Sequence, residues 1–467
     1  MDLASLLIRK ITFPFWMIWD GNVALLRYLR RFDRLEHESR DALLVRQRDN
    51  LRALLHHAHA HSTYYHEVFN QAGLIPERAD LPGDLLRLPL LTKDIVRSRN
   101  ADIIASNVAR DDMFEASTGG STGIPMSFLR DRHCLYLRRA QELHFDHWMG
   151  YEIGHKVATF VAASHYDKPG DRWKEAIRNT TCERMLRFDP HHITDRYMDA
   201  FAARFVAYRP TMIKCFPNSL AIFADFVNRR GLRLPPVRAI SCTGENLYPH
   251  QRQLFADTFG GEVFEKYGTK ETGVMACECS MHRGLHTFTE GSYVEILGAN
   301  GKPAQAGEMG RLVVTDLFNY GMPMIRYEIG DMAVVAARDA CGCGSPLPLI
   351  DRIVGRDRDI LYDGDGNPKP GYLFVETVNA LGLTAQFQII QTARDSVLMK
   401  VIPNGAEAGD IETARLRIAG ILGPRVHVRT ELTNQLPRDP SGKYRYVVSQ
   451  LRPSEQPPSQ PAQLQLP

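Results

Sequence analysis

Short apolar runs alternate with helical stretches through the middle of the chain, and this alternation limits its fold most strongly. The apolar runs have strand length and occupy residues 157–162, 211–216, 262–267 and 311–315. Helix-like stretches such as 220–229 and 250–259 lie between them. Short strands separated by helices predict an α/β fold in which a mixed or parallel sheet is covered by helices on both faces.

The last hundred residues have a different pattern. Strand-like segments at 397–402 and 426–432 flank a helical segment at 411–421, which predicts a small α+β unit with its own core. The preceding segment, 355–371, is rich in Gly, Pro and Asp, as a hinge would be.

Because 467 residues exceed one ordinary core, we expect more than one domain. The last residues contain mainly Pro, Gln and Ser, a composition that predicts disorder. The predicted organisation is a large N-terminal domain 1–355 that begins with a helical segment 1–90, a small C-terminal lid 356–450 and a disordered tail 451–467.

The composition favours a folded protein in a reducing compartment. Hydrophobic residues make up 44% and charged residues 24%, which is the usual balance of globular domains. The 57 basic and 54 acidic residues are mixed along the chain, so no basic face for nucleic acid is indicated. Eight cysteines in this length are too few for a disulfide scaffold, and we expect a cytoplasmic protein.

The N-terminal segment has two interpretations. The apolar run 11–19 follows Arg9 and Lys10, but it lacks a small-residue cleavage site and is too short to span a bilayer. Residues 8–31 either form a helix that lies on a membrane surface or a helix that packs on the protein's own body. The second interpretation is favoured because most amphipathic helices pack in this way. The apolar side chains of this helix are Met17, Ile18, Val23, Leu25, Leu26, Tyr28 and Leu29.

A phosphate-binding loop is predicted at residues 117–125, STGGSTGIP. Glycines let backbone N–H groups converge, and hydroxyl groups add donors, which together suit a polyphosphate. The loop is not a Walker A motif because no Gly-Lys-Ser/Thr follows it. Taken alone, such a run is more often an ordinary surface loop.

Three further segments strengthen this interpretation. Residues 267–271, YGTKE, place an aromatic ring and a carboxylate after a strand, where they suit adenine and magnesium. Residues 326–331, RYEIGD, end in an acid that can accept hydrogen bonds from ribose hydroxyls or merely form a turn. Residues 436–445 carry Lys443 on a glycine-containing loop, where its charge can stabilise a reacting carboxylate and α-phosphate.

The order and spacing of these four segments resemble the acyl-adenylate-forming superfamily. The resemblance is closer to its phenylacetate-CoA ligase-like branch, which includes proteins linked to capsular polysaccharide synthesis. It extends from about residue 51 to residue 448, and it implies a large domain with mixed sheets plus a small mobile lid.

The resemblance assigns roles to individual residues. Lys443 matches the catalytic lysine, and Glu271 matches the magnesium-binding acid of the adenine motif. Asp331 matches the ribose-binding acid, and Arg356 matches the arginine that opens the hinge. The remaining nucleotide-binding positions match Ser117, Thr118, Gly119, Gly120, Ser121, Thr122, Gly123, Gly244, Glu245, Tyr267, Gly268 and Thr269.

Two positions depart from the family pattern. Ile124 replaces a lysine that many relatives have in the phosphate loop, which removes one charge from pyrophosphate binding. Arg358 stands where the hinge usually carries Asp or Lys, so the lid rotation is a less direct inference.

Two Cys-x-Cys pairs and two histidines predict a structural zinc site. Soft ligands from two loops suit a closed tetrahedral site, which leaves no open position for catalysis. The alternative is that they are small buried residues. The branch that the chain resembles has a similar arrangement, which maps to Cys279, His286, Cys341 and Cys343 and leaves Cys277 and His282 as bystanders.

The predicted function is therefore ATP-dependent activation of a carboxylic acid through an acyl-adenylate, with Mg²⁺, followed by transfer to a thiol such as coenzyme A. Two alternatives remain open: transfer to a carrier protein, an amine or a sugar hydroxyl, and a non-catalytic nucleotide-binding homologue. A homodimer is compatible with the sequence. The acid is not determined, although residues 144–148, 216–219 and 241–244 are expected to contribute to the acyl pocket.

Overall fold

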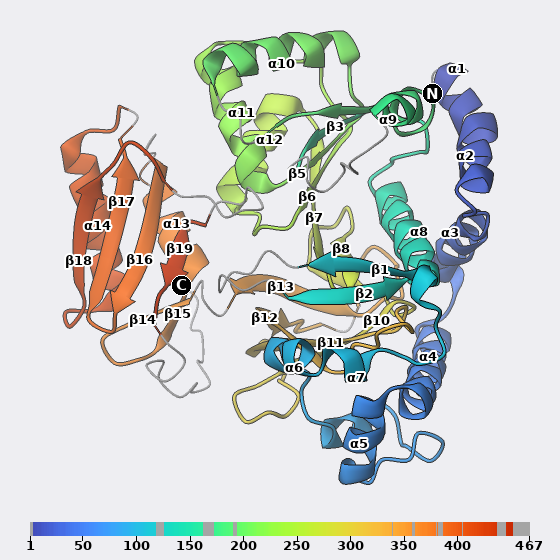
Figure 1. Ribbon diagram of the computed structural model, residues 1–467. Coiled ribbons are helices and arrows are strands. Elements are labelled where there is room, and N and C mark those ends of the chain that lie inside the picture. The colour runs from blue at the N-terminus through green and yellow to red at the C-terminus, as the bar shows by residue number, and fades with distance from the viewer. Residues whose placement is uncertain are drawn as a thin grey trace.

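The computed structural model describes residues 3–117, 126–161, 172–189, 194–338, 340–356, 360–379, 381, 386–403, 405–436 and 445–451. Figure 1 shows a large helix-covered body and a smaller C-terminal unit beside it.

An eleven-stranded mixed sheet forms the centre of the large body, in the order β10-β11-β12-β13-β9-β8-β7-β6-β5-β3-β4. Its first half along the chain is parallel, and the strands from β7 onward pair antiparallel. The strands are β3 Val157–Phe160, β4 Met185–Arg187, β5 Met212–Cys215, β6 Ala239–Thr243, β7 Glu262–Thr269, β8 Gly273–Glu278, β9 Leu285–Thr287, β10 Ser292–Leu297, β11 Met309–Asp316, β12 Tyr327–Val335 and β13 Leu349–Arg356.

Helices cover both faces of the parallel half, as the alternation predicts. α10 (Asp195–Tyr208), α11 (Pro217–Arg229) and α12 (Pro249–Phe259) pack through a phenylalanine-rich core on one face. α8 (Arg132–Trp148) covers the other face. Strands covered on both sides lose their polar–apolar alternation, and all four residues of β5 are indeed buried.

Two lysines are buried under α8 and share one counter-ion. Lys214 on β5 and Lys266 on β7 bind the two oxygens of Asp146, at 2.5 Å and 2.8 Å. The three side chains are almost fully buried, so each charge depends on this pairing for its stability.

Helices from the N-terminus line one edge of the large body, as expected for the helical segment 1–90, and the longest of them is α4 with 22 residues (Figure 1). The favoured interpretation, packing on the protein's own body, holds for Met17, Leu25 and Leu29, because these residues are buried with α8 in one core. These helices are α1 Leu3–Leu7, a π-helical turn Ile8–Thr12, α2 Phe13–Trp19, α3 Ala24–Arg34, α4 Arg40–His61, α5 Thr63–Ala72, α6 Lys93–Ser98 and α7 Asn100–Ile103. None of the described helices is both long and apolar enough to cross a bilayer.

The C-terminal unit has a four-stranded sheet, in the order β18-β17-β16-β19, and a core of its own. It meets the large body where the Tyr248 and Tyr446 rings lie 5.7 Å apart, and where Asn379 bonds His250 at 3.1 Å. The predicted α+β pattern is confirmed, whereas the domain limits stay a prediction and the tail from 452 lies outside the described residues. Its elements are β14 Ile360–Tyr362, β15 Pro368–Pro370, α13 Gly371–Asn379, β16 Gln386–Ala393, β17 Ser396–Ile402, α14 Ala408–Leu422, β18 His427–Leu432 and β19 Val447–Ser449.

Candidate functional site

The predicted phosphate loop connects the two strands of a hairpin. β1 (Met113–Ser117) and β2 (Ser127–Asp131) pair antiparallel, and Ser117 is the last residue of β1. The loop positions Thr118, Gly119, Gly120, Ser121, Thr122 and Gly123, and the departure Ile124, lie outside the described residues. The hairpin therefore fixes where the loop begins and ends.

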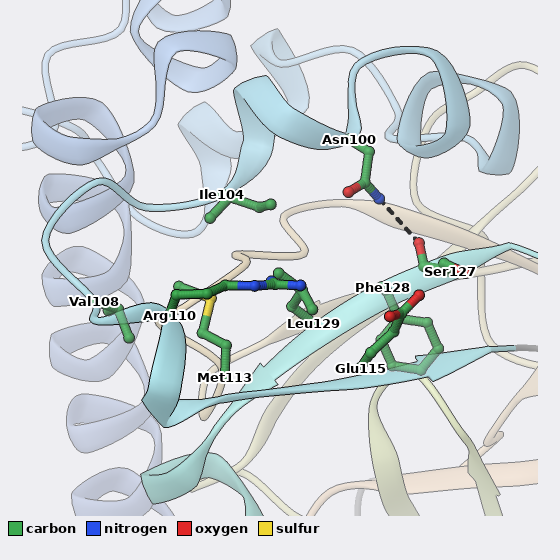
Figure 2. Close-up of a pocket in the computed structure, with 9 residues that line it drawn as sticks. All are labelled: Asn100, Ile104, Val108, Arg110, Met113, Glu115, Ser127, Phe128 and Leu129. Atoms are coloured by element: carbon green, nitrogen blue, oxygen red, sulfur yellow. Dashed lines mark hydrogen bonds between the residues drawn. The ribbon is translucent and has the colours of Figure 1, made fainter.

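A cavity of about 370 Å³ lies beside this hairpin (Figure 2). The Asn100 amide closes part of its wall by donating to the Ser127 carbonyl at 2.9 Å. None of the predicted site residues that the structure describes lines this cavity. Its lining comprises Asn100, Ile104, Val108, Arg110, Met113, Glu115, Ser127, Phe128 and Leu129.

The turn between β7 and β8 positions the predicted adenine and magnesium motif. Gly268 is sterically required, because a Cβ there would lie 2.4 Å from the Gly273 carbonyl oxygen. The hydroxyls of Thr269 and Thr272 lie 2.9 Å apart and close the turn. Glu271 follows in the turn and is only 5% exposed, so its carboxylate needs partners.

Tyr327 supplies one partner to that carboxylate. Its hydroxyl, at the start of β12, donates to Oε1 of Glu271 over 3.0 Å, and its side chain is fully buried. Burial, together with the neighbouring Glu271 charge, raises the pKa of Tyr327. The phenol therefore stays protonated at neutral pH and acts as a donor.

The predicted ribose acid lies beside the adenine motif. Tyr267 donates its hydroxyl to Oδ2 of Asp331 at 2.6 Å, and burial raises the pKa of Tyr267 well above its ordinary value. Arg356 on β13 is paired in register with Asp331, and its Nε lies 3.6 Å from Oδ1. Three segments that the sequence singled out separately therefore meet at one place.

The loop after β6 carries Gly244 and Glu245. Gly244 has φ of +77°, a left-handed conformation that favours glycine. Glu245 accepts a hydrogen bond from the backbone N–H of Asn218 at 3.0 Å. Asn246 donates to the Val354 carbonyl at 3.1 Å, which ties this loop to the strand that carries Arg356.

Sequence reasoning missed two residues of this site. Tyr327 lies inside the RYEIGD segment, but nothing local indicated that its hydroxyl meets Glu271. Arg138 of α8 is buried, donates to the Glu271 carbonyl and pairs with Asp316 at 2.5 Å. No local motif marks Arg138. Lys443 and Arg358 lie outside the described residues, so the reach of the catalytic lysine stays a prediction.

The four predicted zinc ligands converge. The ligand atoms of Cys279, His286, Cys341 and Cys343 all lie within 4.8 Å of one another. Cys279 and Cys341 have their sulfurs 3.6 Å apart, and Cys343 Sγ lies 3.4 Å from His286 Nε2. Tetrahedral zinc with bonds of about 2.3 Å to sulfur places ligands roughly 3.7 Å apart, so the donors fit this metal.

The surroundings of the cluster suit a metal-binding histidine. His286 Nδ1 lies 3.2 Å from the Leu347 carbonyl, an arrangement that leaves Nε2 free of its proton and facing Cys343. The ring of Trp148 packs edge-on against His286 at 5.4 Å, so this expected acyl-pocket residue contacts the cluster. His282 instead bonds Glu278 and Glu262, in agreement with its place as a bystander.

Comparisons with known proteins find similar proteins both by sequence and by fold. No protein-family model matches the chain. Protein CapK of Staphylococcus aureus is 22% identical over 84% of this chain and 86% of its own length. A phenylacetate-coenzyme A ligase of Pseudomonas putida is 23% identical over 80% of this chain and 82% of its own length.

A solved structure of 2-hydroxyisobutyryl-CoA ligase, in the postadenylation state with R3-HIB-AMP, matches with a TM-score of 0.71 at 20% identity. The match covers 89% of this chain and 91% of that one, and it confirms the expected fold. In sequence and in fold, the chain therefore resembles the adenylate-forming enzymes of the phenylacetate-CoA ligase-like branch.

Proposed function

We propose that the protein activates a carboxylic acid with ATP and transfers the acyl group to a thiol, with coenzyme A as the first candidate. The observation that carries the proposal is the meeting of Glu271, Asp331, Tyr267 and Arg356 in a fold of the adenylate-forming type. Hydrogen-bonding and charged groups of this kind are what a nucleotide with a polyphosphate requires.

In the first step, a carboxylate oxygen of the acid attacks the α-phosphorus of ATP, and pyrophosphate leaves. Asp331 would accept hydrogen bonds from the ribose, with its carboxylate already held by Tyr267 and Arg356. Lys443 would approach from the C-terminal unit and offset negative charge on the carboxylate and α-phosphate. In the second step, a thiolate attacks the carbonyl carbon, and AMP leaves.

Glu271 would hold magnesium together with the ATP phosphates. Carboxylate oxygens are the ligands that this ion prefers, and Tyr327 fixes the orientation of the group. Magnesium, when bound, neutralises charge on the phosphate oxygens. The zinc ion, in contrast, would be held by Cys279, His286, Cys341 and Cys343 and would only brace the strands near the site.

A sugar hydroxyl is a second candidate for the acyl acceptor. The similarity to Protein CapK over most of both chains supports keeping this candidate, since the resembling branch includes proteins linked to capsular polysaccharide synthesis. Product analysis with coenzyme A, a carrier protein, an amine and a sugar separates these outcomes.

The test is acid-dependent pyrophosphate release over a panel of carboxylic acids. Lys443→Ala should lower that release by roughly a hundredfold to a thousandfold, the usual cost of removing one transition-state donor. Lys369→Ala is the matched control, because Lys369 belongs to the same C-terminal unit and pairs with Asp363. An unchanged rate for Lys443→Ala counts against the proposed mechanism, and MgATP binding without turnover of any acid favours the non-catalytic alternative.

A further inference from the structure

An exposed apolar face lies on the N-terminal helices. This face also includes two side chains of α9 (Arg172–Arg178). With them, the face contains ten of the eighteen large apolar side chains that are exposed in the described part of the chain. Trp19, for example, is 70% exposed. The N-terminal apolar face comprises Leu3, Leu6, Leu7, Ile11, Phe15, Ile18, Trp19 and Val23, with Trp173 and Ile177 of α9.

A π-helical turn keeps the central row of this face on one side. Leu3, Leu7, Ile11, Phe15 and Trp19 recur every four residues along α1, the π turn and α2. In a continuous α-helix, with 3.6 residues per turn, this spacing would drift around the axis. The π turn holds more residues per turn, so it offsets the drift and keeps the row aligned.

The opposite side of the same helices is anchored to the body. Ser5, Ile8, Phe13 and Met17 are buried, and the Ser5 hydroxyl donates to the Gly154 carbonyl at 3.0 Å. One side is therefore fixed in the fold, and the other has no covering element among the described residues.

α9 extends the face sideways. Its last residue, Arg178, pairs with Asp20 at 2.7 Å, and Trp16 donates to the Thr181 hydroxyl at 3.0 Å. Figure 1 shows α9 beside α1 and α2 at the same edge of the molecule. Two segments more than 150 residues apart in sequence thus supply one surface.

The charges around this face favour a negatively charged partner. Residues 3–34 contain six Arg or Lys and two Asp, and no acid lies between residues 3 and 19. One of the acids, Asp20, is paired with Arg178, and the nearby Glu152 is paired with Arg9 at 2.8 Å. The exposed cations Lys10 and Arg30 add to the positive potential.

We propose that the N-terminal apolar face docks on an anionic lipid surface. Apolar side chains insert below the headgroups, Trp rings suit the interface, and cations attract acidic lipids. A second copy of the chain fits less well, because a two-fold contact would bring the same cations of both copies together. The inference does not depend on the proposed enzymatic activity.

The test is flotation of the full-length protein with vesicles of phosphatidylcholine, alone or with about a third phosphatidylglycerol, an anionic lipid. We expect binding to the anionic vesicles, and weaker binding in roughly 0.5 M salt because screening shortens the reach of the charges. Ile11→Ser combined with Trp19→Ser should lower the partition coefficient by about tenfold or more. Lys10→Gln combined with Arg30→Gln should remove most of the preference for anionic lipid.

Leu416→Ser combined with Leu432→Ser is the matched control, since both residues are exposed apolar side chains of the C-terminal unit. This control should bind vesicles like the parent protein, and all variants should melt at the parent temperature because every changed side chain is exposed. Absence of vesicle binding, or equal losses in the control, overturns the proposal. A dimer that dissociates in the Ile11/Trp19 variant without any vesicle binding also overturns it and assigns the face to a second copy.

Discussion

Removal of the Tyr327 hydroxyl tests whether Glu271 is held ready for magnesium. Tyr327→Phe deletes one oxygen and keeps the ring that fills the core. The lost hydrogen bond runs from the Tyr327 hydroxyl to Oε1 of Glu271, 3.0 Å away, and Glu271 is only 5% exposed. Hydrogen bonds to charged groups contribute about 1.5–3 kcal/mol, and solvent has little access to replace this one.

We expect two measurable losses of this size. The free energy of unfolding, measured with denaturant, should fall by about 1.5–3 kcal/mol if the carboxylate stays buried without the donor. If Glu271 holds magnesium, MgATP affinity should also fall by roughly 10- to 150-fold, since about 1.4 kcal/mol corresponds to a tenfold change. Titration of Mg²⁺ at fixed ATP should show that a higher magnesium concentration is needed.

Tyr197→Phe is the matched control, because the Tyr197 hydroxyl accepts from the Asp189 backbone N–H and lies on α10, which carries none of the predicted site residues. This control should leave the magnesium dependence unchanged. A Tyr327→Phe protein with the parent stability and the parent magnesium dependence refutes the assignment of Tyr327 as the residue that positions Glu271.

Three further predictions concern the metal cluster, the buried lysines and pH. Cys341→Ser should abolish an expected content of one zinc per chain, measured by metal analysis, and lower the melting temperature by on the order of 10 °C. Asp146→Asn should cost about 3–5 kcal/mol in denaturant unfolding, because it removes the carboxylate that buried Lys266 contacts at 2.8 Å and leaves buried Lys214 only Glu142, at 3.4 Å. Asp199→Asn, at an exposed ion pair with Arg230, should cost under about 1 kcal/mol. Burial and a nearby carboxylate raise the pKa of Glu265 from 4.5 to about 8, so the folded state retains a proton that the unfolded state releases. Stability should therefore fall as pH rises from 4.5 to about 8, and Glu265→Gln should flatten this dependence in unfolding experiments across that range.

The sequence predicted those features that depend on local patterns. The period of the apolar residues located β7, α11 and α14 because helices and strands bury side chains at different spacings. Residue chemistry marked the segment that carries Gly268, whereas Gly244 was assigned only through the family resemblance; at both positions the backbone geometry favours glycine.

Which segments contact one another was decided only by the tertiary structure. Tyr267 and Asp331, or Cys279 and Cys341, come together through strand register across the large sheet, and no local pattern encodes that register. Arg138 reaches the site from a helix whose sequence looks like any amphipathic helix. Periodicity likewise showed that the N-terminal helices have an apolar side, but only packing decided that Met17 and Leu25 face the core while Phe15 and Trp19 face outward. A local pattern fixes the period of an element, whereas its buried face depends on every neighbour that the rest of the chain brings to it.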